Sequence, residues 1–162
     1  MASGALDIGA LYRTYGHSVL RRARQILGTD DDAKDVLHEI FTGLVSRPAQ
    51  FSGKSAPSTF LYAATTNACL ARLRDHKNRA RLLAEHVKPW TTERDPRTVE
   101  TRVLVRAVLA ELPEDEAHAA VYSHLDGMSH AEIADVLGCS ARHVGDLLVR
   151  ATERLRGHKE AS

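Results

Sequence analysis

Apolar residues recur every three or four positions along most of this chain, and that spacing predicts amphipathic helices. The first apolar stripe covers residues 6–27 and ends at Gly28, a residue type that commonly stops a helix. The second begins at Thr29, which has the capping-box spacing with Asp32, and Pro48 closes it. The aspartates at its start suit the positive end of a helix dipole.

The third predicted helix spans Thr59 to about Glu85, with Ser58 as its N-cap. A break at residues 86–98 contains two prolines and is the best candidate for a linker. Beyond the break, four shorter helices are predicted: residues 99–111, Pro113 to about Leu125, a helix capped by Ser129 with Glu132, and one capped by Ser140.

No strand-like alternation of any length is present, so the sequence predicts an all-α protein. It has two helical domains, residues 1–85 and 99–162, joined by a flexible linker at residues 86–98. A length of 162 residues with 43% hydrophobic and 27% charged residues suits two small globular domains. The chain lacks an apolar run of membrane-spanning length and a secretory signal, and has two cysteines, so a cytoplasmic protein without membrane insertion is expected.

The net charge of +1 conceals an asymmetry along the chain. Residues 1–83 carry a net charge of +5, residues 84–111 are neutral, and residues 112–162 carry −4. A basic front and an acidic rear indicate two modules with different partners.

Motifs for catalysis are not found: the sequence has no glycine-rich phosphate loop, nucleophile elbow or Cys-x-x-Cys. The nine histidines have no metal-ligand spacing next to a cysteine. Cys69 and Cys139 lie at semi-apolar positions that favour the core. We therefore expect a non-enzymatic protein with no catalytic residue, cofactor or metal.

The strongest local signal is a helix-turn-helix over residues 127–155. Its first helix is expected to brace the second by packing Ile133 and Ala134 against Val144, which leaves the start of the second helix free to enter a DNA major groove. Arg142 is the best candidate for a base contact, because arginine reads guanine bidentately. The alternative is a plain three-helix packing unit. The candidate DNA-binding residues are Ser140, Ala141, Arg142, His143, Gly145, Asp146 and Arg150.

A basic tract at residues 72–81 ends the third predicted helix. It is either a solvated helix end whose cations suit the helix dipole, or a phosphate-binding strip beside Phe60, Tyr62 and Asn67. Composition favours neither.

With both features on one chain, residues 11–156 resemble the extracytoplasmic-function sigma factors, which are two-domain initiation factors of bacterial RNA polymerase. The stretch 32–41 resembles the family's Asp-Ala-Glu-Asp-x-x-Gln-Glu-x-Phe signature. This resemblance implies that the helix contacts the polymerase core through Asp35, Glu39 and Phe41. The alternative for the two acids is an ordinary solvated face.

Residues 58–74 are similar to the helix with which this family melts promoter DNA and reads the −10 element. The loop at residues 51–57 would then lie near an extruded base. Melting needs side chains that capture unpaired bases and cations that follow the backbone. The resemblance assigns these roles to Phe60, Tyr62, Asn67, Arg72, Arg74 and Lys77.

The rear domain resembles the family's −35-reading module, and residues 109–114 resemble the entry to its flap-binding helix. The sequence departs from the family at Ala63, Ala71, Gly145, Asp146 and Leu147, which replace the usual Arg, Asp, Lys, Ser and Arg. Fewer cations neutralise fewer phosphates. Either the promoter is unusual, or the rear domain mainly binds protein.

Three functions remain open. The leading interpretation is a sigma factor whose partners are the RNA polymerase core, promoter DNA and an anti-sigma factor. The second is a stand-alone helix-turn-helix regulator that binds duplex DNA without polymerase. The third is a degenerate sigma-like protein that binds polymerase without melting DNA.

Overall fold

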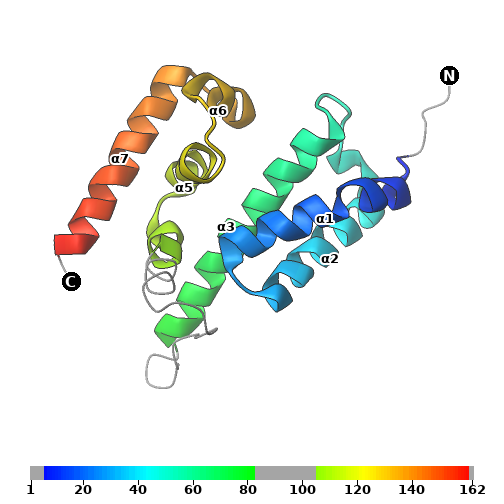
Figure 1. Cartoon of the computed structure of the whole chain (residues 1–162), viewed down its shortest axis with the longest axis horizontal. Helices are drawn as coiled ribbons and strands as arrows, with labels where there is room; N and C mark the ends of the chain where they lie inside the picture. Colours follow the sequence, from blue (N-terminus) through cyan, green and yellow to red (C-terminus); the bar gives the residue numbers. More distant parts are fainter. Residues whose placement is uncertain (1–5, 83–104, 161–162) are drawn as a thin grey trace. The chain divides into compact units, whose positions relative to one another are not determined.

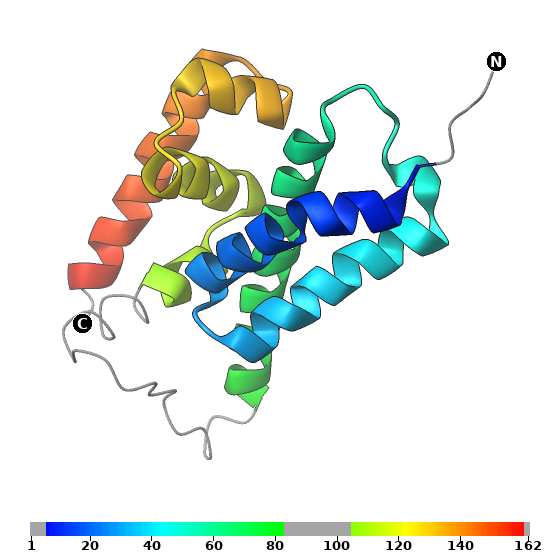
Figure 2. The same ribbon diagram turned by 45° about the vertical axis from the view of Figure 1, so that its right-hand side comes forward.

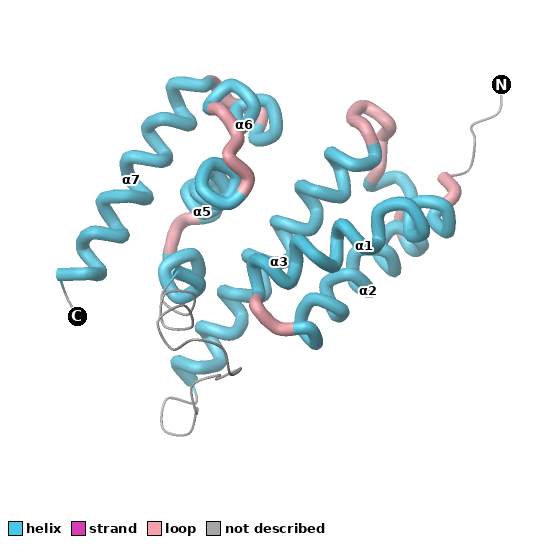
Figure 3. Tube along the Cα trace, in the orientation of Figure 1, coloured by secondary structure: helices cyan, strands magenta, loops and turns pink. Residues whose placement is uncertain are grey.

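The computed structural model describes residues 6–82 and 105–160, which form helices joined by turns and contain no strand (Figure 3). The all-α prediction is confirmed for this part of the chain. The chain divides into two compact units, Met1–Cys69 and Leu70–Ser162, and the division falls inside the helix α3. None of the helices in the described ranges has both the length and the apolar character needed to span a bilayer. Each unit is described by itself.

The first unit opens with α1 (Ile8–Leu27), and its ends are set by local chemistry (Figure 1). The carboxylate of Asp7 accepts a hydrogen bond from the Ala10 amide at 2.9 Å, an N-cap that the sequence analysis missed. Gly28 ends the helix with φ of 81°, a left-handed conformation that glycine adopts without a Cβ clash. The predicted stop is confirmed.

The second helix, α2 (Asp30–Ser46), follows directly and lies beside α1 (Figure 1 and Figure 2). The capping-box prediction for Thr29 is wrong in its chemistry. The Thr29 hydroxyl donates to the Asp32 carboxylate at 3.0 Å and caps no backbone amide. A short carboxylate at this position takes the hydroxyl proton, so the first turn relies on its three aspartates and the helix dipole.

A 3-10 turn, η1 (Pro48–Gln50), and a loop lead to α3 (Pro57–Leu82). The predicted start of this helix is corrected. Pro57 opens the helix, where its missing amide proton costs nothing, and Ser58 lies inside the first turn instead of capping it. The predicted end at Glu85, the linker at 86–98 and residues 99–104 of the next helix lie outside the described residues, so the proposed domain limits stay predictions.

Three helices share the core of the first unit. Val19 of α1, Phe41 and Leu44 of α2, and Leu61 of α3 form one buried cluster. The Phe41 and Tyr12 rings pack in a T-shaped arrangement, with 5.1 Å between the ring centroids. This cluster holds the three helices together and leaves the outer faces of α2 and α3 to solvent.

The second unit begins with the C-terminal part of α3, from Leu70, and continues within the described residues with a helical segment at 105–111 and α5 (Glu114–Ala120). Pro113 is the N-cap of α5, close to its predicted place. The helix then widens into the π-helical turn η2 (Val121–Leu125), where the sequence analysis expected a plain continuation. The helices α6 (His130–Leu137) and α7 (Ala141–Glu160) complete the unit.

Candidate nucleic-acid interface

Local capping interactions set the ends of α6 and α7, the two helices of the helix-turn-helix. Ser129 Oγ accepts from the Glu132 amide at 3.2 Å, and the Glu132 carboxylate accepts from the Ser129 amide at 2.9 Å. Gly138 ends α6 with φ of 69°. Ser140 Oγ then accepts from the His143 amide at 3.1 Å and starts α7. The capping predictions for both helices are confirmed.

Apolar packing holds these two helices in the arrangement that the sequence predicted. Ile133 and Ala134 of α6 and Val144 of α7 are buried, so the bracing contact has its expected residues. Leu147 is also buried, at 3% exposed. Leu147 is therefore a core residue on the apolar face of α7, and it takes no part in the exposed surface of the helix.

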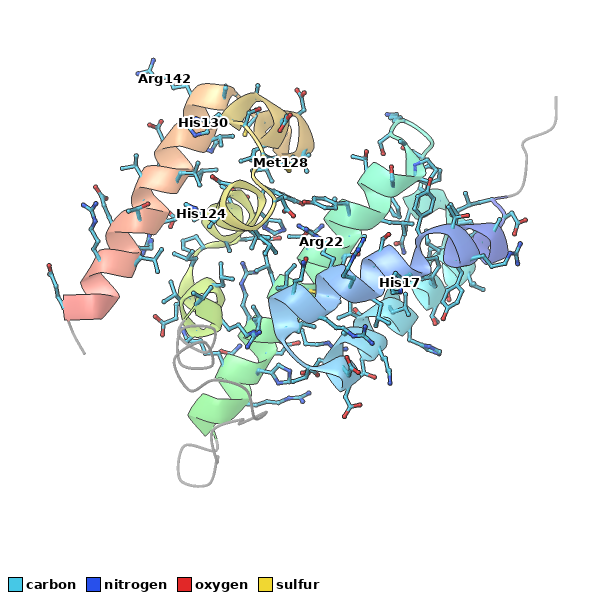
Figure 4. The ribbon with its side chains drawn as sticks, in the orientation of Figure 1. His17, Arg22, His124, Met128, His130 and Arg142 are labelled. Atoms are coloured by element: carbon cyan, nitrogen blue, oxygen red, sulfur yellow. The ribbon has the colours of Figure 1, made fainter. Side chains whose placement is uncertain are left out.

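The start of α7 presents its polar side chains to solvent. Figure 4 shows Arg142 projecting away from the end of α7. The exposed residues are the predicted ones: Ser140, Ala141, Arg142, His143, Asp146 and Arg150. This surface has the exposure that a major-groove contact needs, with Asp146 as a carboxylate among the cations.

Gly145 is half-buried because the imidazole of His130 lies over it. A Cβ added at Gly145 would lie 3.7 Å from His130 Nδ1, an ordinary van der Waals distance. Figure 4 places His130 between α6 and α7. His130 comes from the first turn of α6, so it adds an exposed ring to the surface that Arg142 begins. The sequence analysis did not single out His130, because only the packing brings it to α7.

An ion pair at the back of the helix-turn-helix ties α7 to α5. The Glu116 carboxylate is only 3% exposed, and Arg154 Nε donates to it at 2.8 Å. Glu116 lies in the first turn of α5, where a carboxylate also suits the positive end of the helix dipole. Its burial and its partner 38 positions away identify it as an anchor for α7.

On α3, the predicted −10 residues differ in their surroundings. Phe60 is half-buried, and its ring packs against the Phe51 ring in a T-shaped arrangement with 5.3 Å between the ring centroids. Asn67 is exposed and Tyr62 is partly exposed. The guanidinium of Arg22, a buried residue of α1, lies 3.6 Å from the centre of the Tyr62 ring.

The cations further along α3 are partly exposed. Arg74 Nη1 lies 3.9 Å from a Glu114 carboxylate oxygen, and Lys77 Nζ lies 3.3 Å from one of Glu111. Arg72 is half-buried. Ion pairs with this much solvent access contribute about 0–1 kcal/mol, so a nucleic-acid phosphate can replace them at little cost.

The outer face of α2 carries the predicted acidic pair. Asp35 and Glu39 are four residues apart and both are exposed, as a partner contact requires. Phe41 is only 6% exposed and belongs to the core cluster. Its predicted contact with polymerase does not fit this burial, because the ring is already covered by α1 and α2. We assign Phe41 to the support of the helix.

In the part of the chain that the structure describes, no group of three or more His, Cys, Asp or Glu side chains is arranged so that it could hold a metal ion. Cys69 is buried, as predicted for a core residue, and Cys139 is partly buried. Neither cysteine forms a disulfide.

Two protein-family models match the chain in the places where these surfaces lie. Sigma-70 region 2 matches residues 11–79, and Sigma-70 region 4 matches residues 102–155. The first match contains the acidic pair on α2 and the candidate residues of α3. The second contains the helix-turn-helix. The resemblance drawn from the sequence is therefore confirmed in both halves of the chain.

Comparisons with individual proteins support the same family. The ECF RNA polymerase sigma factor SigM of Mycobacterium tuberculosis is 32% identical over 145 residues, which cover 90% of this chain and 73% of SigM. The ECF RNA polymerase sigma-E factor of Haemophilus influenzae is 29% identical, covering 77% and 73% of the two chains. The fold also resembles that of the sigma factor RpoE of Bartonella quintana, solved with the anti-sigma factor NepR (TM-score 0.56, 15% identity, 93% and 95% covered). The chain belongs to the extracytoplasmic-function (ECF) family of RNA polymerase sigma factors.

Proposed function

We propose that this protein binds the core of a bacterial RNA polymerase and directs it to specific promoters, acting in the cytoplasm without catalytic residues, metal or cofactor of its own. The observation that carries this proposal is the presence of both region 2 and region 4 on one chain. A stand-alone regulator needs the helix-turn-helix but has no use for region 2.

The polymerase contact is proposed for the acidic face of α2. Asp35 and Glu39 are exposed, while the opposite face of the helix is fixed in the core by Val36 and Leu44. A face held in this way offers its carboxylates without further ordering of the backbone, which lowers the entropic cost of binding.

The −10 contact is proposed for α3. Phe60 and Tyr62 supply aromatic surface, Asn67 an exposed amide, and the following turns three cations: Arg72, Arg74 and Lys77. Aromatic rings stack on unpaired bases of any sequence, and cations beside them hold the backbone. This combination suits capture of a melted strand better than readout of duplex DNA.

The −35 contact is proposed for α7, with Arg142 as the base-reading residue. Arg142 is exposed and is the one arginine in the first two turns of this helix. Because residues 112–162 carry a net charge of −4, nonspecific attraction to DNA is weak in this unit. Recognition here then depends on specific contacts and on the attachment of the unit to polymerase.

An anti-sigma factor is proposed as a further partner. Support comes from the related fold of RpoE, which was solved with the anti-sigma factor NepR. An inhibitor that covered the acidic face of α2 would prevent polymerase binding by simple exclusion.

Run-off transcription with purified core polymerase and genomic DNA of the source organism tests the proposal. Discrete 5′ ends that share an upstream motif would support it and would reveal the promoter. If the protein binds the polymerase core but produces no transcripts, the result would favour the degenerate sigma-like protein. Lack of core binding would favour the stand-alone regulator.

A further inference from the structure

Arg22 is buried in the first unit, although arginine is almost never fully buried unless it is paired. Its side chain is 6% exposed and projects from α1 (Figure 4). The neighbouring Arg21, one position earlier on the same helix, is exposed. Burying a cation costs desolvation free energy, so specific contacts must compensate for it. Arg22 makes these contacts with α3, the candidate melting helix.

The contacts of Arg22 use the guanidinium fork. Its Nε and Nη2 both donate to the hydroxyl oxygen of Thr66 on α3, at 3.0 and 2.8 Å. The Thr66 hydroxyl donates its own proton to the carbonyl of Tyr62 at 3.0 Å. The oxygen therefore gives its single proton to the backbone and keeps two lone pairs for the two guanidinium N–H groups.

The same guanidinium also covers the Tyr62 ring. Arg22 Cζ lies 3.6 Å from the ring centroid, within cation–π distance. Tyr62 and Thr66 are one helical turn apart, so a single cation holds both. The buried guanidinium covers the ring face against which it lies, while Tyr62 as a whole stays partly exposed.

We infer that Arg22 is a positioning residue for promoter melting: it fixes the orientation of the Tyr62 ring, whose exposed part then receives an unpaired base of the −10 strand. The inference rests on the proposed function of α3. A base that stacks on a fixed ring loses less side-chain entropy than one that stacks on a mobile ring. The cation beneath the ring adds favourable electrostatics without touching DNA.

The test uses holoenzyme and a promoter obtained by run-off mapping, with open complexes measured by permanganate reactivity of unpaired thymines. Arg22→Met is expected to reduce open-complex formation about three- to tenfold, the range for the ordering of one side chain. Arg22→Lys keeps the charge without the fork and should lie between Arg22→Met and the native protein. Arg21→Met, the matched control, removes the same charge from an exposed position and should have little effect.

A double-mutant cycle with Tyr62→Ala separates positioning from a purely structural role. If Arg22 acts through Tyr62, Arg22→Met has no further effect on melting in the Tyr62→Ala protein. An equal loss with and without Tyr62 would overturn the inference, as would an Arg22→Met protein that melts DNA as well as the native one. Core-polymerase binding and the thermal midpoint are measured for each variant.

Thr66→Val provides a second route if Arg22→Met does not fold, because it removes the hydroxyl that accepts from Arg22 and keeps the volume. It should reduce melting in the same direction, and only while Tyr62 is present. An unchanged yield of open complex from a folded Thr66→Val protein would also count against the inference. A failure of the proposed function is distinct, since the native protein itself would then produce no open complex.

Discussion

Replacing Gly145 by alanine is expected to stabilise the protein, although this glycine lies in the helix proposed to contact DNA. Glycine in a helix interior is about 0.8–1.0 kcal/mol less favourable than alanine, because it loses more backbone freedom on folding. The new Cβ would lie 3.7 Å from His130 Nδ1, which needs no displacement of the ring. The propensity gain therefore remains, and we expect about 0.5–1 kcal/mol of added stability.

Two other glycines provide the controls. Gly157 lies on α7 with no other atom near the position of an added Cβ. Gly157→Ala should stabilise less than Gly145→Ala, because it is close to the frayed end of the helix. Gly138 has a φ of 69°, where a Cβ is strained, so Gly138→Ala should destabilise by about 1 kcal/mol. The same substitution thus changes sign with backbone conformation.

Thermal unfolding followed by circular dichroism measures all three variants. A gain of 1 kcal/mol raises Tm by about 2–4 °C if the chain unfolds as one unit, and by about 4–8 °C if the second unit unfolds alone. A Tm that falls for Gly145→Ala while it rises for Gly157→Ala would refute the reasoning. It would mean that a steric clash between the new Cβ and the His130 ring costs more free energy than the gain in helix propensity provides.

Three further predictions concern the surfaces and their supports. Arg154→Met should lower the free energy of unfolding, measured by urea denaturation, by about 1–3 kcal/mol. This is less than the loss expected on breaking a fully buried ion pair, because Arg154 is half-exposed. An unchanged free energy of unfolding would mean that water replaces the guanidinium as the partner of Glu116. Arg142→Ala should cost about 1–3 kcal/mol on the native promoter and relax one base preference, and an unchanged promoter profile would exclude its base contact. Replacing both Asp35 and Glu39 by lysine should abolish binding to the polymerase core in pull-down assays without lowering Tm. Glu153→Lys, which reverses the charge of an exposed residue on α7, should retain core binding. If the double variant still binds the core, the acidic pair is only a solvated face of α2.

The Gly145 series and the Arg22 inference bear on different steps of initiation. Gly145→Ala acts on the stability of the unit that carries the −35 surface, and it leaves α3 unchanged. Arg22→Met acts on the support of Tyr62 and leaves α7 unchanged. Measuring promoter binding and promoter opening separately therefore assigns each effect to its own helix.

The local architecture could be predicted from the sequence, because caps and stops act within about four residues. Gly138, a typical stop residue, ends α6, and the capping box of Ser129 and Glu132 and the cap at Ser140 are present as predicted. So are the exposed acids of α2, since the spacing of apolar residues dictates which face of a helix is buried. The failures at this range, Thr29 and Ser58, came from competing short-range partners: a nearby carboxylate and a proline that opens the helix.

The roles of residues whose partners are distant in the sequence could be recognised only in the tertiary structure. Arg22 meets Thr66 across 44 positions, and Glu116 meets Arg154 across 38. In the sequence, both charges look like ordinary surface charges, because periodicity carries no information about which distant side chain will satisfy a buried ion. The sequence by itself determined the helical architecture, the caps of α6 and α7 and the family of this protein. The packing decided which charged side chains are buried as supports and which remain on the surface to bind.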